Sequence, residues 1–134
     1  MNTTGNQRDD LLKMLEGADL SGMLASREQA QRAEVRRILL GFLEVLDAVD
    51  RAAVERKGEP TLNAIQKQLV KTCEQAGIHF FRSRGQPFDP LRHKVLEVRV
   101  GKVAAEIVTE EVTRGCEWNE ELLRPAGVVV TRPQ

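Results

Sequence analysis

Few residues in the chain have the chemistry to bind a metal or act as a nucleophile. There are two histidines, His79 and His93, and two cysteines, Cys73 and Cys116. The cysteines lie far apart and outside any C-x-x-C, and no carboxylate or thiol stands at ligand spacing from either histidine, so we predict no metal site and no disulfide framework. A structural hydrogen bond beside the preceding F-D-P turn is the better interpretation of His93. We interpret Cys116 as a partly buried, inert thiol in a turn between strands.

Two pairs of neighbouring acids are the other candidates for chemistry, Glu110-Glu111 and Glu120-Glu121. Neighbouring residues on a strand point to opposite faces. The two carboxylates of either pair therefore do not face the same substrate bond, and we interpret both pairs as solvated surface charges. The sequence also has no phosphate-binding glycine loop, no H-E-x-x-H and no G-x-S-x-G elbow. These observations favour a binding protein without cofactor over an enzyme.

The composition is typical of a folded chain and excludes several classes of partner. The 134 residues include 20 Lys+Arg and 20 Asp+Glu, so the net charge is zero, which argues against nucleic-acid binding as the main role of the protein. No apolar run approaches the ~20 residues of a membrane span. Nothing at the N-terminus is typical of a signal peptide, so we expect a cytoplasmic protein without a membrane partner.

A long helix is predicted from about Gly22 to Lys57. Its apolar residues recur at steps of three and four, as in a heptad seam: Val35, Ile38, Phe42, Val45 and Val49. A second apolar stripe lies beside this seam: Leu39, Leu43, Leu46 and Ala53. A helix of ~35 residues is too long for one compact globule of this size, so we assign the seam to dimerisation.

A helical hairpin follows from the turn at residues 57–60. Gly58 ends the first helix and Pro60 begins the second, which is predicted over Thr61–Gln75 with Gly77 at its C-terminal end. Two copies of the hairpin would form a four-helix bundle. Upstream, Gly17 and Gly22 are expected to interrupt a short helical turn, and residues 1–20 are predicted to be a flexible tail.

The period changes to that of strands after residue 90. We predict short strands at 96–100, 106–113, 122–124 and 127–131, with turns at Gly101-Lys102 and at Cys116–Glu120. Such a small β region is marginal alone, so it should pack on the helices. The predicted fold is α+β, with a tail (1–20), a helical dimerisation region (21–84) and a β-wing domain (85–134).

Three segments carry a family resemblance. Residues 42–52 (FLEVLDAVDRA) resemble the L-L-P-V-L-D-N-L-E-R-A segment of the GrpE family. Residues 85–93 (GQPFDPLRH) resemble its G-x-x-F-D-P-x-x-H, and residues 123–130 (LRPAGVVV) resemble its closing L-R-P-A-x-V-x-V. The three occur in the family's order, over about residues 35–132.

The resemblance implies a nucleotide-exchange factor for a DnaK-type heat-shock chaperone. Such a protein is a homodimer of long paired helices, a four-helix bundle and a β-wing on each subunit. It binds the ATPase domain of the chaperone, opens its nucleotide cleft and promotes ADP release, by favouring the open state. No covalent step is needed, so the resemblance also implies that the chain is not an enzyme.

Residues that contact the chaperone are implied only where positions match the family. Arg51 matches the arginine of the helical segment, and the alternative for it is a solvated helix charge. Phe88 matches the helix–wing junction, where its favoured role is to fix the wing. Val112 and Val130 match wing positions at or near the chaperone, and the alternative for both is plain core.

The departures from the family pattern bear on function. Before the L-R-P-A segment the family commonly carries N-G-R, whereas this chain has Asn119-Glu120-Glu121. A basic contact position is thus Glu121 here, which implies a partner with a basic matching surface. The chain also carries little of the family's upstream tail. The alternatives are a dimeric interaction scaffold that binds a partner without driving exchange, and an enzyme whose site the sequence does not reveal.

Overall fold

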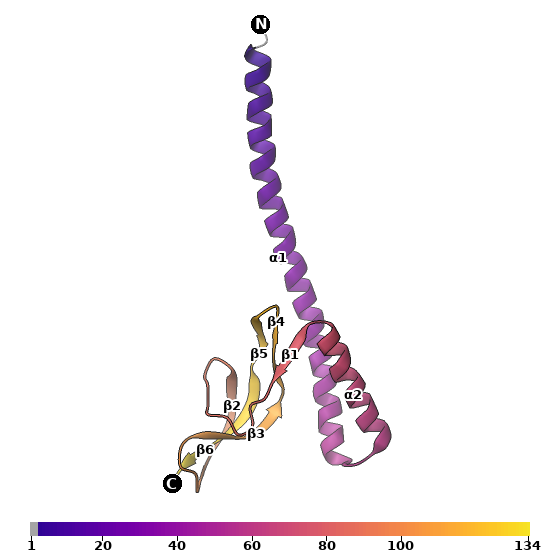
Figure 1. The fold of residues 1–134 in the computed structure, drawn as a ribbon, viewed down its shortest axis with the longest axis vertical. Helices are drawn as coiled ribbons and strands as arrows, with labels where there is room; N and C mark the ends of the chain where they lie inside the picture. Colours follow the sequence, from indigo (N-terminus) through magenta and orange to yellow (C-terminus); the bar gives the residue numbers. More distant parts are fainter. Residues whose placement is uncertain (1–2) are drawn as a thin grey trace. The chain divides into compact units, whose positions relative to one another are not determined.

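The residues that the structure describes fold as two helices followed by six short strands (Figure 1). The computed structural model describes residues 3–134, except the side chains of 3–7 and 13–19. The elements are α1 (Thr3–Glu55), α2 (Pro60–Gln75), β1 (Ile78–Phe81), β2 (His93–Gly101), β3 (Ile107–Thr113), β4 (Gly115–Trp118), β5 (Glu121–Arg124) and β6 (Ala126–Pro133). The predicted α+β class is confirmed. The chain divides into two compact units, one up to Ile38 and one from Leu39 onward.

Helix α1 begins earlier than the sequence predicted. It continues through Gly17 and Gly22, where we expected an interruption, and its first residue is Thr3. The correction has a simple cause: a glycine inside a helix costs about 1 kcal/mol relative to alanine and does not forbid the helix. Most of the segment predicted as a tail therefore has helical backbone, whereas residues 1 and 2 lie outside the described residues. The flexibility of the segment and the predicted domain bounds stay predictions.

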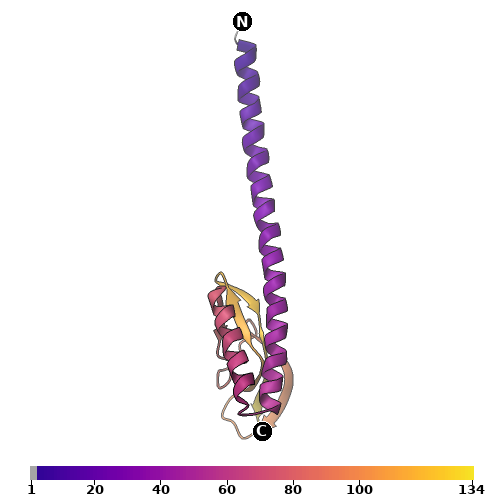
Figure 2. The same ribbon diagram turned by 90° about the vertical axis from the view of Figure 1, so that its right-hand side faces the viewer.

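The helical hairpin forms as predicted. Gly58 has a φ of 85° in the turn, and the Glu59 carboxylate caps α2 by accepting hydrogen bonds from the backbone N–H groups of Thr61 (3.2 Å) and Leu62 (2.6 Å). Gly77, with a φ of 90°, follows the other end of α2. Figures 1 and 2 both show α2 alongside the C-terminal part of α1.

The strands form two three-stranded sheets, with the orders β1-β4-β5 and β2-β6-β3. We call the six strands together the β lobe. Four predicted strands are confirmed as β2, β3, β5 and β6. Two strands were not predicted: β1, at residues 78–81, and β4, which occupies part of the stretch wrongly predicted as a turn at 116–120. Within the second sheet, β6 is the central strand, parallel to β2 and antiparallel to β3.

The main core joins the helices to the first sheet. Leu39, Leu43 and Leu46 of α1, from the second predicted stripe, are buried against residues of α2 and of the β1-β4-β5 sheet: Cys73, Ile78, Cys116 and Leu123. This contact confirms that the β lobe packs on the helices. A smaller core lies within the β lobe, where Val108, Ala126, Val128 and Val130 pack with Phe81 and Phe88.

Candidate interaction cleft

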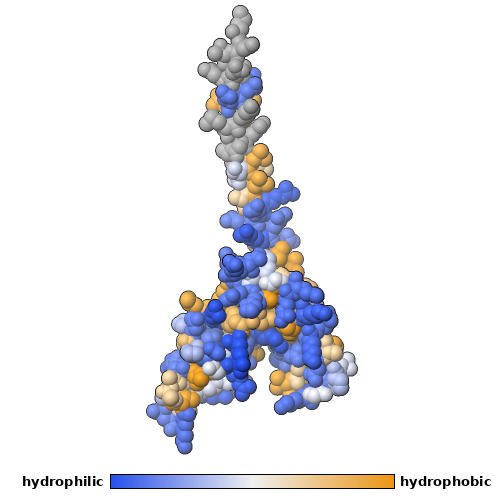
Figure 3. All heavy atoms as spheres, in the orientation of Figure 1, coloured by the Kyte–Doolittle hydropathy of each residue, from blue (hydrophilic) through white to orange (hydrophobic). Residues whose placement is uncertain are grey.

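A broad cleft opens between the helical hairpin and the β lobe. Its volume is about 1210 Å³, and Figure 3 shows it as the notch at lower centre. The C-terminal end of α1, the α1–α2 turn and α2 form one side, and strands β1 and β3 form the other. All of these elements belong to the unit that begins at Leu39, so the cleft is a feature of that unit alone.

Two of the predicted contact residues line this cleft together. Arg51 of α1 is exposed on the helical side, and Val112 of β3 is 49% exposed on the strand side. Val54, which is 79% exposed, adds a second apolar side chain. Exposed apolar side chains that gather on one surface are a common feature of protein-binding sites. The cleft therefore has an exposed apolar side chain on each side and the Arg51 cation on the helical side.

Both sides of the cleft carry charges of both signs. The helical side has the basic Arg51 and Lys57 and the acidic Glu55. The strand side has Arg82, in the segment after β1, and the acids Glu110 and Glu111 of β3. A partner segment that enters the cleft therefore meets positive and negative groups on either side.

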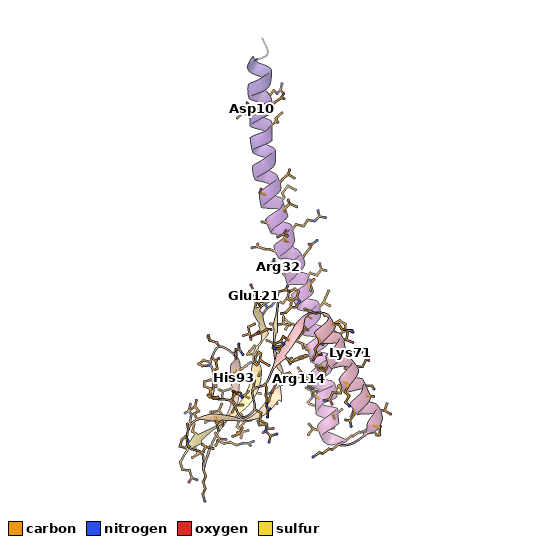
Figure 4. The ribbon with its side chains drawn as sticks, viewed as in Figure 1. Asp10, Arg32, Lys71, His93, Arg114 and Glu121 are labelled. Carbon is orange, nitrogen blue, oxygen red and sulfur yellow. The ribbon has the colours of Figure 1, made fainter. Side chains whose placement is uncertain are left out.

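One end of the α1 wall is joined to the β lobe by a bidentate ion pair. Arg114 donates to Asp50 through Nε (2.8 Å to Oδ2) and Nη2 (3.1 Å to Oδ1), and Gln66 donates to the same carboxylate at 2.7 Å. The guanidinium also lies over the ring of Phe80, 5.5 Å from its centroid. The hydrogen bonds with Asp50 raise the pKa of Arg114 above its ordinary value. Figure 4 places Arg114 between the β lobe and α1.

A second bidentate pair joins the same two elements. Arg124 donates to Asp47 at 2.7 and 2.9 Å, and it also donates twice to the backbone carbonyl of Arg114, at 3.0 and 2.8 Å. Asp47 and Asp50 are three residues apart on α1 and so lie on one face of the helix. Sequence reasoning missed this network. A signal was present, because Asp47 and Arg124 lie inside two of the family-like segments.

The other predicted contact residues lie elsewhere. Glu121 is exposed in the β4–β5 hairpin (Figure 4) and does not line the cleft. Val130 is only 1% exposed, within the core of the β lobe, which favours the core alternative for this residue. Phe88 is half-buried against the same core, in agreement with a junction role, and lines a separate cavity of about 430 Å³.

The histidine and cysteine interpretations agree with the structure. The Nδ1 atom of buried His93 accepts a hydrogen bond from the Asp89 backbone N–H at 2.9 Å, which confirms its structural role. Cys116 is fully buried in β4 rather than in a turn, and burial raises its pKa to about 11. Burial also raises the pKa of Cys73. Burial and a raised pKa both disfavour the thiolate, in agreement with the interpretation of Cys116 as inert.

The histidine, cysteine and acidic side chains that the structure describes form no group of three placed to hold a metal ion. None of the described helical residues makes up a stretch apolar and long enough for a membrane crossing.

The predicted dimerisation residues lie outside the core of the chain. Phe42 and Val45 are 47% and 52% exposed, although they alternate along α1 with the buried Leu43 and Leu46. Val49 is half-buried, and the two seam residues of the first unit, Val35 and Ile38, are exposed. The helix therefore has one apolar stripe that the chain buries itself and another that it leaves uncovered.

The comparisons with known proteins agree on one family. A statistical model of the GrpE family matches residues 21–132. The chain is 31% identical over 114 residues to Protein GrpE of Carboxydothermus hydrogenoformans, which covers 81% of this chain and 59% of the relative. It is 30% identical to Protein GrpE of Thermoplasma acidophilum and 29% identical to that of Bacillus subtilis, over 78% of this chain and 59% and 60% of those relatives. The chain thus spans about three fifths of the length of these relatives. Because the family match extends over most of its residues, the chain belongs to the GrpE family.

Proposed function

We propose that the chain is a nucleotide-exchange factor that binds the ATPase domain of a DnaK-type chaperone and promotes ADP release. The observation that carries the proposal is the shared cleft: Arg51 and Val112, transferred separately from the family pattern, line one surface. A second support is the chemistry of this surface, which has exposed apolar side chains and charges of both signs and so suits a protein segment. Binding of this kind needs no covalent step.

The mechanism follows from differential binding. A protein that binds the open form of the ATPase domain better than the closed form shifts the domain toward opening, and ADP then leaves. By linkage, bound ADP must weaken the binding of the exchange factor by the same factor. Exposed Glu121, in the β4–β5 hairpin, adds a preference for a partner with a basic matching surface.

The uncovered stripe supports a homodimer as the working state. Two copies that pair through the seam containing Phe42 and Val45 would each contribute α1 and α2 to a four-helix bundle. The buried stripe is already occupied by the core of the chain itself. The bundle would therefore form without disturbing the β lobe.

The test is stopped-flow release of a fluorescent ADP from DnaK-type chaperones of the same organism. We expect the protein to accelerate release, and Arg51→Ala to weaken binding by about tenfold, as for a contact residue at an interface. Lys71→Ala is the matched control, because Lys71 is an exposed cation of α2 that does not line the cleft (Figure 4). It should leave binding and release unchanged.

The outcomes separate the alternatives. Binding without acceleration would identify an interaction scaffold, a possibility that the acidic residue at position 121 keeps open. Neither binding nor acceleration with any chaperone of the organism would refute the proposed function. Equal effects of Arg51→Ala and Lys71→Ala would show that the cleft is not the contact surface.

A further inference from the structure

The ion pairs that join the β lobe to α1 differ from the others in the lobe. The side chains of Asp47 and Arg124 are 12% and 18% exposed, and those of Asp50 and Arg114 are 20% and 30% exposed. By contrast, the pair Arg99–Glu97, within β2, is more than half exposed on both sides. Exposed ion pairs contribute little to stability and restrict the geometry little. Bidentate pairs that are shielded from water restrict the relative position of the groups that they join.

The two junction ion pairs are also connected to each other by hydrogen bonds. Arg124 binds Asp47 with one edge of its guanidinium and donates to the carbonyl of Arg114, whose own side chain binds Asp50. Gln66 of α2 donates to Asp50 and so ties the second helix into the same network. The network thereby connects α1 and α2 with the strands β4 and β5 and with Arg114, the residue that precedes β4. Because bidentate hydrogen bonds are more specific in geometry than apolar contacts, this network favours one position of the β lobe on α1.

Stiffness at this junction has a consequence for an exchange factor. A ligand shifts a two-state equilibrium only by the difference between its affinities for the two states. A β lobe that swings freely would adapt to the closed ATPase domain as well as to the open one, and would then bind both without opening either. A lobe held firmly on α1 fits one state and is strained by the other.

We propose that Asp47, Asp50, Arg114 and Arg124 are positioning residues that set the exchange activity rather than the affinity of the protein. The proposal rests on the proposed function, because it concerns how binding is converted into opening. Asp47 and Arg124 are the sharper test, since neither lines the cleft and their replacement removes no contact there. The four side chains act through the position of the β lobe.

The experiment compares two double variants of the full chain. Asp47→Asn with Arg124→Gln removes the inner junction pair, and Glu106→Gln with Arg132→Gln is the control. The control removes an ion pair of the same lobe, with a shortest distance of 2.7 Å, between Arg132 of β6 and Glu106, the residue before β3. Both leave the net charge unchanged. Each protein is titrated against the nucleotide-free and the ADP-bound chaperone, and the ratio of the two Kd values is the readout.

We expect the junction variant to bind the nucleotide-free chaperone within about threefold of wild type, while the ratio of Kd values falls by about tenfold toward one. ADP release should slow in proportion at saturating protein. The control variant should keep the wild-type ratio. An unchanged ratio in the folded junction variant, or an equal loss of both affinities, would overturn the proposal.

A second measurement needs no chaperone. Amide hydrogen exchange in β4 and β5 should be faster in the junction variant than in wild type, and unchanged in the control. If the double variant fails to fold by circular dichroism, Asp47→Glu keeps the charge but displaces the anchor by one methylene, and a smaller fall of the ratio is then expected. Equal exchange in β4 and β5, or a wild-type ratio in Asp47→Glu, refutes the positioning role. If the wild-type protein itself has a ratio of Kd values of one, the result refutes the proposed exchange function itself.

Discussion

Two residues of the β4–β5 turn adopt backbone conformations that favour glycine. Asn119 and Glu120 have φ values of 52° and 64°, and the flanking residues Trp118 and Glu121 pair across the hairpin. Two central residues with positive φ are typical of the type I′ turn, for which Asn-Gly is the preferred sequence. The family pattern has glycine where this chain has Glu120. The substitution places a side chain in a conformation that costs about 1 kcal/mol or more.

Glu120→Gly should therefore raise the free energy of unfolding by about 1 kcal/mol, because it relieves the left-handed conformation. Urea unfolding followed by circular dichroism measures the change. Asn119→Gly is the control and should give a smaller gain, since asparagine tolerates positive φ better than glutamate does. A loss of stability in Glu120→Gly would mean that the Glu120 side chain makes a compensating contact.

The cap of α2 predicts a pH dependence. The backbone N–H of Leu62 donates to the Glu59 carboxylate and lowers its pKa below the ordinary value of 4.5. Since the folded-state pKa is the lower one, the stabilisation is present above about pH 4.5 and is lost as the pH falls through the folded-state value. Wild type should melt at a higher Tm than Glu59→Ala at pH 7, and this difference should shrink at pH 3. A difference independent of pH would show that the carboxylate is not the cap.

The residue scale also shows where sequence reasoning stops. His93 was predictable, because its hydrogen bond is formed with Asp89, four residues away in the same turn. Asp47 and Arg124 are 77 residues apart, and no local pattern indicates that their side chains meet. Val112 and Val130 look alike in the sequence, yet one is half-exposed on an edge strand and the other is buried in the central strand. Burial depends on sheet order, which the sequence does not state.

At the scale of elements, the helices were easier to predict than the strands. The 3.6-residue period and the turn at Gly58 and Pro60 define the hairpin locally. Strands β1 and β4 have four residues each, too few to show an alternating pattern, and they pair with each other across more than thirty residues. The predicted β-wing boundary at residue 85 therefore excluded β1, although β1 completes the sheet that packs on the helices.

The close approach of strands at Gly115 gives a prediction for this element. A Cβ at this position would meet the ring of Phe81 and lie 2.6 Å from the backbone nitrogen of Ala126. Gly115→Ala should lower the free energy of unfolding by about 2 kcal/mol, because a backbone atom cannot move aside cheaply. Gly41→Ala is the matched control: nothing lies within 4 Å of its Cβ, and it should raise stability by up to about 1 kcal/mol through helix propensity.

Thermal unfolding of both variants tests this difference. The informative result is the opposite sign of the two changes, because both substitutions add the same methyl group. If Gly115→Ala were as stable as wild type, the strands would have room to separate, and the stiffness proposed for the junction would lose support.

For the whole molecule, the uncovered stripe on α1 predicts the oligomeric state. Wild type should sediment as a dimer at micromolar concentration, and Phe42→Glu should raise the dimer Kd by about a hundredfold or more, because pairing would bury a charge without a partner. Phe42 is 47% exposed in the single chain, so Phe42→Glu should leave the hydrophobic core of each subunit intact. Glu44→Lys, at an exposed position of the same helix, is the control. A monomeric wild type would remove the four-helix bundle from the proposal.

The order of the strands has a consequence for synthesis. Strand β6 is the last strand in the sequence, yet it lies in the middle of its sheet, and β2 and β3 pair with it and not with each other (Figure 1). While a ribosome makes the chain from its N-terminus, the two helices of the hairpin emerge one directly after the other. Strands β2 and β3, by contrast, cannot pair until Ala126–Pro133 has emerged, and Val108 of β3, which is 1% exposed in the folded chain, stays uncovered until then. During its synthesis the chain thus passes through a stage at which its strand edges are unpaired.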